Sequence, residues 1–152
     1  MCVEDAITAW GLPSNLVGNF EYKFKGNVSY FKERSYSLDN GYTFCLWDLD
    51  KCQEVVVVDF FITKGRLLET SVRLQLIHIP FEEYRGKEVS RFYIQKIKEY
   101  ALSRNVTLMK YIANPKDPFF KVSKDLKNLS RDQLINYYSS FADHHFRVES
   151  IG

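Results

Sequence analysis

The chain of 152 residues has few cysteines, few glycines and prolines, and little net charge. Its three cysteines are an odd number without metal-ligand spacing, which excludes a disulfide-rich secreted scaffold and predicts reduced thiols in a cytoplasmic protein without a metal site. The 21 basic and 19 acidic side chains leave a formal net charge of +2, so the overall charge does not favour nucleic acid as a partner. The longest apolar run, residues 55–62, is interrupted by Asp59 and is too short to cross a membrane.

Aromatic residues, in contrast, are abundant. They make up 16% of the chain, with 12 Phe, 10 Tyr and 2 Trp, and this composition favours a core rich in β-sheet. No internal repeat or Pro/Gly-rich linker divides the sequence, and its length suits one core. We therefore predict a single domain over residues 1–152.

The first half of the chain reads mainly as strands. Residues 3–10 form a short helix candidate that ends before Gly11. Residues 19–25 then alternate aromatic and charged side chains, the period of two expected for a half-buried strand. Further strands are predicted at 28–36, 42–47, 55–62 and 67–79, and together they form an antiparallel meander with 55–62 as its buried central strand.

The hydrophobic period changes after Pro80. Apolar residues recur at three-and-four spacing and predict an amphipathic helix over 87–103. A strand at 106–113 follows, and Ser130 with Gln133 forms a capping box that opens a second helix, reaching about residue 142. A last strand is expected at 146–151. The predicted fold class is α+β: a mixed, mostly antiparallel sheet of about six or seven strands with helices packed on it.

The segment after Pro80 is also the most informative about chemistry. A long strand ends, a short basic turn follows, and a helix begins at once. The first amides of a helix have no acceptor within the helix, and the helix dipole attracts anions to them. Arg85 and Lys87 add positive charge beside those amides, and Gly86 lets the backbone approach a ligand closely. Solvated turn charges are the alternative reading of the two basic residues.

The string Tyr84-Arg85-Gly86-Lys87-Glu88-Val89-Ser90 resembles the turn with which the GNAT superfamily of acyl-CoA-dependent N-acyltransferases holds the diphosphate of CoA. The resemblance covers about residues 67–151 and implies a GNAT-like fold, acetyl-CoA as co-substrate and an amine acceptor, either a small molecule or a protein amine. It implies that the cofactor-binding residues are Ile77, Ile79, Arg85, Gly86, Lys87, Val89 and Ser90.

A second stretch, Leu134 to Phe141 followed by His145 to Val148, is similar to the later helix and strand of that superfamily. By this resemblance Tyr138 takes the place of the tyrosine that protonates the departing thiolate. A buried tyrosine with a purely structural role is the alternative.

Glu69 and His78, both in the strand predicted at 67–79, are candidates to take the proton of the amine. Glu69 also reads as a charge on a solvated sheet face. His78 shares strand parity with Val72, Leu74 and Leu76, which makes a core or rim histidine its default reading.

One position departs from the GNAT pattern. Glu88 stands where the turn has its middle glycine and places a negative charge beside the expected diphosphate, unless it points outward or pairs with Arg85 or Arg91. Two functions follow from the two arrangements. The first is an N-acetyltransferase, and the second is a catalytically inactive GNAT-fold protein that binds or inhibits a protein partner. A homodimer is left open.

Overall fold

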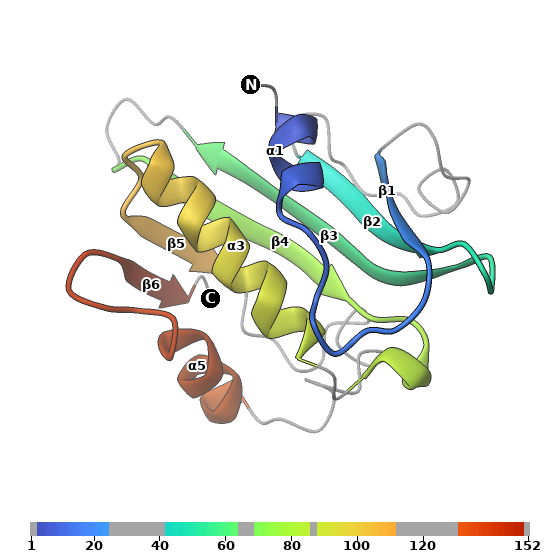
Figure 1. Ribbon diagram of the computed structural model, residues 1–152. Helices are drawn as coiled ribbons and strands as arrows, with labels where there is room; N and C mark the ends of the chain where they lie inside the picture. Colours follow the sequence, from blue (N-terminus) through green and yellow to red (C-terminus); the bar gives the residue numbers. More distant parts are fainter. Residues whose placement is uncertain (1–2, 25–41, 64–68, 86–87, 112–130, 151–152) are drawn as a thin grey trace.

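The computed structural model describes residues 3–24, 42–63, 69–85, 88–111 and 131–150 (Figure 1). The strands are, in chain order, β1 (Phe20–Phe24), β2 (Tyr42–Asp48), β3 (Gln53–Thr63), β4 (Ser71–His78), β5 (Leu108–Tyr111) and β6 (Arg147–Ser150). The helices are α1 (Val3–Ala9), α3 (Val89–Ser103) and α5 (Arg131–Ser139), and the 3₁₀ turn η1 (Glu82–Tyr84) stands between β4 and α3.

The six described strands form one sheet in the order β1-β2-β3-β4-β5-β6. β1 to β4 pair antiparallel, whereas β5 pairs parallel with β4, and β6 parallel with β5. This is the predicted α+β class with a mixed, mostly antiparallel sheet, and the prediction is confirmed. The single domain over 1–152 stays a prediction, because the structure describes only part of that range.

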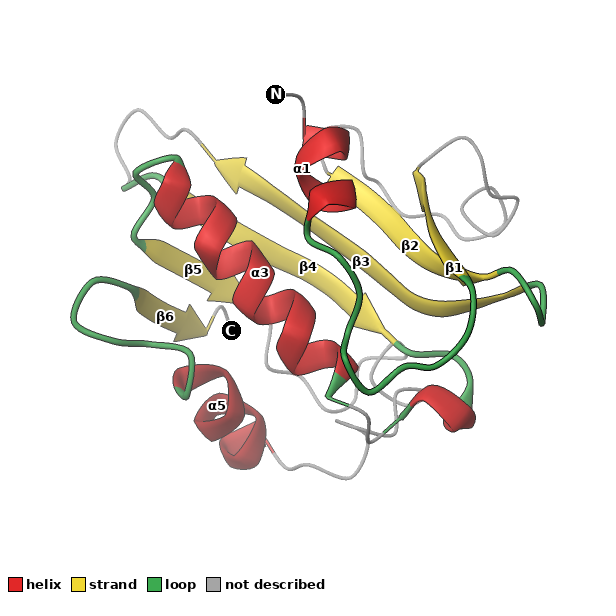
Figure 2. Cartoon of the chain, in the orientation of Figure 1, coloured by secondary structure: helices red, strands yellow, loops and turns green. Residues whose placement is uncertain are grey.

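The described helices lie on one face of the sheet (Figure 2). The two parallel connections, β4–α3–β5 and β5–α5–β6, step in the same direction across the sheet. Such connections are right-handed almost without exception, so both place their helices on the same face. The other face of the sheet is therefore free of described helices.

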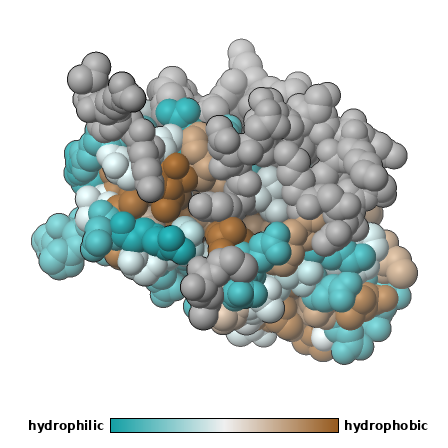
Figure 3. Space-filling view, turned by 90° about the horizontal axis from the view of Figure 1, so that it is seen from above, coloured by the Kyte–Doolittle hydropathy of each residue, from teal (hydrophilic) through white to brown (hydrophobic). Residues whose placement is uncertain are grey.

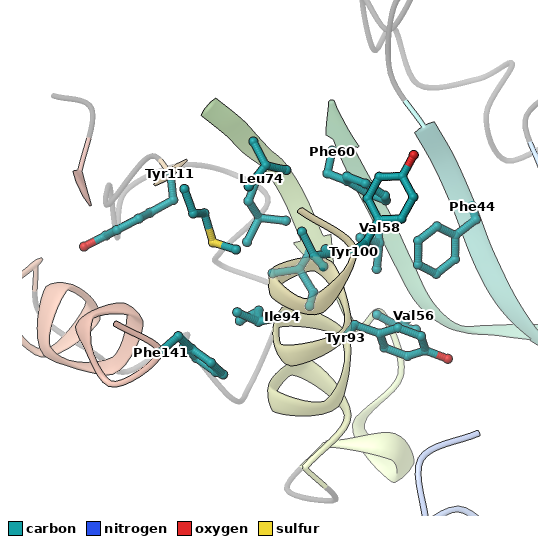
Figure 4. Packing of buried hydrophobic residues seen from close by; sticks show 14 of the residues in the cluster. Phe44, Val56, Val58, Phe60, Leu74, Tyr93, Ile94, Tyr100, Tyr111 and Phe141 are labelled. Carbon is teal, nitrogen blue, oxygen red and sulfur yellow. The ribbon is translucent and has the colours of Figure 1, made fainter. Parts of the chain in front are cut away.

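The main core lies between α3 and the sheet. Val58 and Phe60 of β3 are fully buried under the helix, which contributes Tyr93, Ile97 and Tyr100. The rings of Phe60 and Tyr100 meet edge to face with centroids 5.8 Å apart. Figure 4 shows Tyr93 and Tyr100 of α3 directed toward the strands, as the three-and-four spacing of the sequence predicts.

Side chains of β3 are buried on the opposite face as well. Val57 and Asp59 have no exposed surface, and the Thr43 hydroxyl of β2 donates to Asp59 Oδ1 at 2.8 Å. A strand buried on both faces reads as a continuous apolar run. The prediction that 55–62 is the central strand is thus confirmed.

Other predictions lie outside the described residues: the strand at 28–36, the last two residues of the strand at 106–113, and the capping residue Ser130. None of the described helices has both the length and the apolar character needed to traverse a bilayer. In the view of Figure 3, hydrophilic patches of the described surface alternate with smaller hydrophobic ones.

Candidate functional site

The candidate site lies at the end of the sheet where β4 leads into α3. Ile77 and Ile79, at the end of β4, are buried. The chain then passes through η1 and Arg85 and enters α3 after Glu88. Gly86 and Lys87, two of the predicted cofactor-binding residues, lie outside the described residues.

β4 and β5 pair only over part of their lengths. Their register runs from Val72, opposite Met109, to Leu74, opposite Tyr111. β4 continues to His78, and after Leu74 it has no partner on its β5 side among the described residues. The described pairing of β4 with β5 therefore ends at Leu74 and Tyr111, and Tyr111 is the last described residue before 131.

A β-bulge in β4 coincides with this point. Leu76 pairs with Asp59 and Leu74 with Phe60, so Gln75 is an extra residue without a partner on β3. A bulge bends its strand and increases the local twist. The bend therefore falls directly after the last described pair of β4 with β5.

The bulge also corrects the predicted parity of His78. Leu74 and Ile77 both belong to the core under α3, although they are three residues apart. His78 pairs with Val57 on the opposite face and is almost fully buried there. Its reading as a core histidine is confirmed, but the expectation that it shares the face of Val72 and Leu74 is wrong, because the extra residue reverses the alternation.

Glu88 points away from the junction. It adopts left-handed backbone angles, φ 63° and ψ 19°, and its carbonyl accepts the Phe92 amide at 3.0 Å. Its side chain is 65% exposed, and the carboxylate Oε2 lies 3.3 Å from Arg91 Nε. The outward arrangement with Arg91 as partner is therefore the one that occurs. Glycine would adopt these left-handed backbone angles without the steric cost that the Glu88 side chain brings.

The first turn of α3 packs firmly on its surroundings. Val89 and Ser90 are buried, and the Ser90 and Tyr137 hydroxyls are hydrogen-bonded at 3.0 Å. The Arg91 guanidinium lies over the Tyr137 ring, 5.3 Å from its centroid, and is similarly close to Phe141. The amino end of α3 is thereby joined to α5.

Arg85 uses part of its guanidinium to hold the turn. Its Nε donates to the Ile79 carbonyl and one terminal nitrogen to the Pro80 carbonyl, both at 3.1 Å. The side chain fixes the exit of β4 and keeps a positive charge beside the junction.

Tyr138 lies beside the last described pair of β4 and β5. Its ring stacks on that of Tyr111, with centroids 4.1 Å apart, and Tyr111 is the β5 partner of Leu74. Tyr138 is almost fully buried, and this burial, followed by the neighbouring Tyr137 and Tyr111 hydroxyls, raises its pKa. The hydroxyl therefore stays protonated at neutral pH.

The three predicted catalytic residues are not brought together. Glu69 precedes β4 at its opposite end, roughly 25–30 Å along the chain from His78 at about 3.3 Å per residue. Its exposed carboxylate pairs with Arg147, which lowers the pKa of Glu69. Tyr138 lies on the helix face of the sheet, whereas His78 lies on the other face.

No motif in the sequence singles out the polar network that ties the junction to the β2–β3 turn. The Tyr84 hydroxyl donates to Asp48 Oδ2 at 2.6 Å, and Gln53 donates to Tyr84 and Glu83. Lys51 pairs with Glu83. The available signal was an acidic pair, Asp48 and Asp50, in a turn between two strands, which sequence alone reads as an ordinary turn.

A metal site finds no support in the parts of the chain that are described, where no group of three or more His, Cys, Asp and Glu side chains is placed to hold an ion. Cys45 is buried and Cys52 exposed, both as free thiols.

The sequence matches no protein-family model and no curated protein. Among solved structures, the chain is similar to an integron cassette protein from the mobile metagenome of V. cholerae, with 12% sequence identity and a TM-score of 0.47. The similarity covers 65% of this chain and 78% of the cassette protein.

Proposed function

We propose that the chain is an acyl-CoA-dependent N-acyltransferase of the GNAT type, with acetyl-CoA as acyl donor and an amine as acceptor. The observation that carries the proposal is the β-bulge at Gln75, which bends β4 at the end of the sheet where α3 begins. In the proposal β4 bends away from β5 beyond Leu74, and its amides and carbonyls on that side bond an extended ligand.

The amino end of α3 supplies the complementary site for the diphosphate. The amides of Val89 and Ser90 lie in the first turn, where no intrahelical acceptor exists. Arg85 adds a positive charge, and Arg91 neutralises part of the Glu88 charge that would otherwise oppose an anion. In the proposal, the rest of the CoA molecule runs from this end along β4, past Ile77 and Ile79.

In the proposed reaction the neutral amine attacks the thioester carbonyl carbon. The C–N bond forms, the C–S bond breaks, the Tyr138 hydroxyl gives its proton to the departing thiolate, and His78 takes the surplus proton of the amine nitrogen. Tyr138 and His78 lie on opposite faces of the sheet, which suits a donor and an acceptor that approach from opposite sides. Both side chains are buried, so β4 and its surroundings have to open for the reacting atoms of acyl-CoA to reach them.

The first test is binding of CoA to the full chain, by isothermal titration and by the unfolding temperature. A ligand that binds only the native state stabilises it by about 2.7 kcal/mol at a concentration 100 times its Kd, so a saturable rise is expected. Absence of binding at millimolar CoA, with the far-UV circular dichroism spectrum intact, would refute the transferase and favour the non-catalytic partner-binding protein.

The second test separates catalysis from binding. Tyr138→Phe is expected to lower kcat with a panel of amines by about a hundredfold or more while CoA affinity is kept. His78→Gln is expected to remove the acidic limb from the pH profile of kcat/KM. Tyr137→Phe is the matched control, since it removes a neighbouring hydroxyl that bonds Ser90. Equal losses in Tyr137→Phe and Tyr138→Phe would contradict the assigned role of Tyr138.

A further inference from the structure

A second feature at the same end of the sheet is a pocket of about 310 Å³. The α1–β1 connection, the β2–β3 turn and η1 form its walls, and these segments lie close together in Figure 1. Phe20 and Tyr84 contribute aromatic surface to the lining. The pocket adjoins the β4–α3 junction, and among the described residues its lining contains none of the predicted cofactor residues.

The lining of this pocket is negatively charged. Asp48, Asp50 and Glu83 contribute three carboxylates, against the single ammonium of Lys51. The hydrogen bond from Tyr84 lowers the pKa of Asp48, and the hydrogen bond from Lys51 lowers the pKa of Glu83, so both carboxyls are ionised at neutral pH. A cation is the complementary ligand.

One of these carboxylates already holds an alkylammonium. The Lys51 ammonium contacts Glu83 Oε2, and both side chains are exposed to solvent. Exposed ion pairs are weak and exchange readily, because water competes for both partners. An incoming ammonium or guanidinium can therefore displace Lys51 from Glu83.

Exposed hydrophobic side chains lie around the pocket. Four large hydrophobic side chains of the described residues are exposed, and three of them belong here: Val17 is 95% exposed, Leu49 45% and Phe81 37%. Val17 lines the pocket, Leu49 stands between Asp48 and Asp50, and Phe81 is two residues from Glu83. Apolar side chains gathered on a surface are typical of interaction sites.

We propose that this pocket binds a basic peptide segment of a protein partner, with a lysine or arginine side chain in the pocket and apolar neighbours of that residue on Val17, Leu49 and Phe81. A bare metal ion is disfavoured, because the described carboxylates are not grouped as metal ligands. An organic cation with apolar flanks matches both the charge and the exposed side chains. The proposal does not depend on acyl transfer and goes beyond it.

The test is a titration of the full chain, without CoA, with a short blocked peptide that carries lysine between two leucines. Saturable binding is expected by isothermal titration, weakened by added salt because the contact is partly electrostatic. Peptides with norleucine or glutamate in place of lysine are expected to bind about tenfold more weakly or not at all. Equal binding of the norleucine peptide would overturn the proposal in favour of a purely apolar surface.

Charge variants with opposite expected signs make the test specific. Asp50→Asn and Glu83→Gln are each expected to weaken binding of the lysine peptide about two- to fivefold. Lys51→Met removes the internal competitor and is expected to strengthen it by a similar factor. Glu149→Gln, an exposed position on the distant strand β6, makes the same charge change as Glu83→Gln and should have no effect.

Two results would refute the pocket as the site: loss of affinity in Glu149→Gln equal to that in Glu83→Gln, or weaker binding in Lys51→Met with the spectrum of the folded chain intact. Because CoA is absent from every titration, these outcomes are separate from success or failure of the proposed transferase.

Discussion

The antiparallel and parallel halves of the sheet differ in the length of their described strands. β3 has 11 residues and pairs with neighbours on both sides, whereas β5 and β6 have four described residues each. β4 belongs to both halves, and the bulge at Gln75 bends it just beyond its last described pair with β5. The antiparallel half is therefore a continuous frame, and the bend of β4 lies where the two halves meet.

The aromatic residues follow the same division. On the antiparallel side, rings from β1, β2, α3 and the residue after α1 pack around Phe44, which contacts Trp10, Tyr22 and Tyr93 with centroids 5.5–5.8 Å apart. On the parallel side, the Tyr111–Tyr138 stack lies beside the last described pair of β4 and β5. We therefore expect stability to depend mainly on the first half and CoA binding on the second.

The largest expected effect breaks the antiparallel frame. Phe44→Ala removes a fully buried ring with three ring contacts, and large-to-small changes of phenylalanine typically lower the free energy of unfolding by about 3–5 kcal/mol. Urea denaturation followed by circular dichroism measures this. Phe44→Leu, which keeps most of the volume, should cost clearly less, and a loss below about 1 kcal/mol in Phe44→Ala would show that the aromatic cluster does not carry the frame.

The next effect concerns the link between the frame and the junction. Tyr84→Phe removes the donor to Asp48 and is expected to lower the free energy of unfolding by about 1 kcal/mol at pH 7. Because the folded pKa of Asp48 is depressed, this stabilisation is fully present above the unfolded pKa, near about 3.9, and is lost as pH falls through the lower folded pKa. Urea denaturation at pH 7 and at pH 2.5 measures the difference, which should shrink in acid. A difference that stays constant with pH would indicate lost packing instead.

A smaller effect tests the left-handed residue at the entrance to α3. Glu88→Gly is expected to raise the free energy of unfolding by about 0.5–1 kcal/mol, because glycine adopts this backbone without strain. Glu99→Gly is the matched control: within the same helix it should lower stability by about 1 kcal/mol. Denaturant melts of the two variants should thus move in opposite directions. Movement in the same direction would mean that the Glu88 backbone is not strained.

The smallest effect is expected at the far end of β4. Glu69→Gln removes an exposed ion pair with Arg147 far from the junction, so the unfolding temperature and CoA affinity should both stay within error of the wild type. Differential scanning fluorimetry with and without CoA measures both quantities. A selective loss of CoA binding would return Glu69 to the list of site residues.

Much of the secondary structure was predictable from local patterns. The alternation at 19–25 became Phe20–Phe24, and the three-and-four spacing at 87–103 became Val89–Ser103. Both patterns arise from side chains that face a core at the period of their own element, so a short window of sequence contains them.

The strand predicted at 67–79 has a feature that local sequence patterns do not predict. An uninterrupted period of two puts His78 on the same face as Leu74, but the bulge at Gln75 reverses the faces beyond it. The bulge results from the pairing of β4 with β3, and nothing in the β4 sequence alone specifies it. The candidate site shares this limit, because the turn at 84–90 was visible in sequence but the separation of Tyr138, His78 and Glu69 was not.

By itself, the amino-acid sequence determined the types and order of the elements and the basic turn before α3, since these follow from neighbouring residues. Only the tertiary structure decided on which face His78 lies, where β4 bends, and that Asp48, Glu83 and Val17 surround one pocket. The physical reason is that faces, bends and pockets depend on which distant segments pair, and pairing is a property of the whole packed chain.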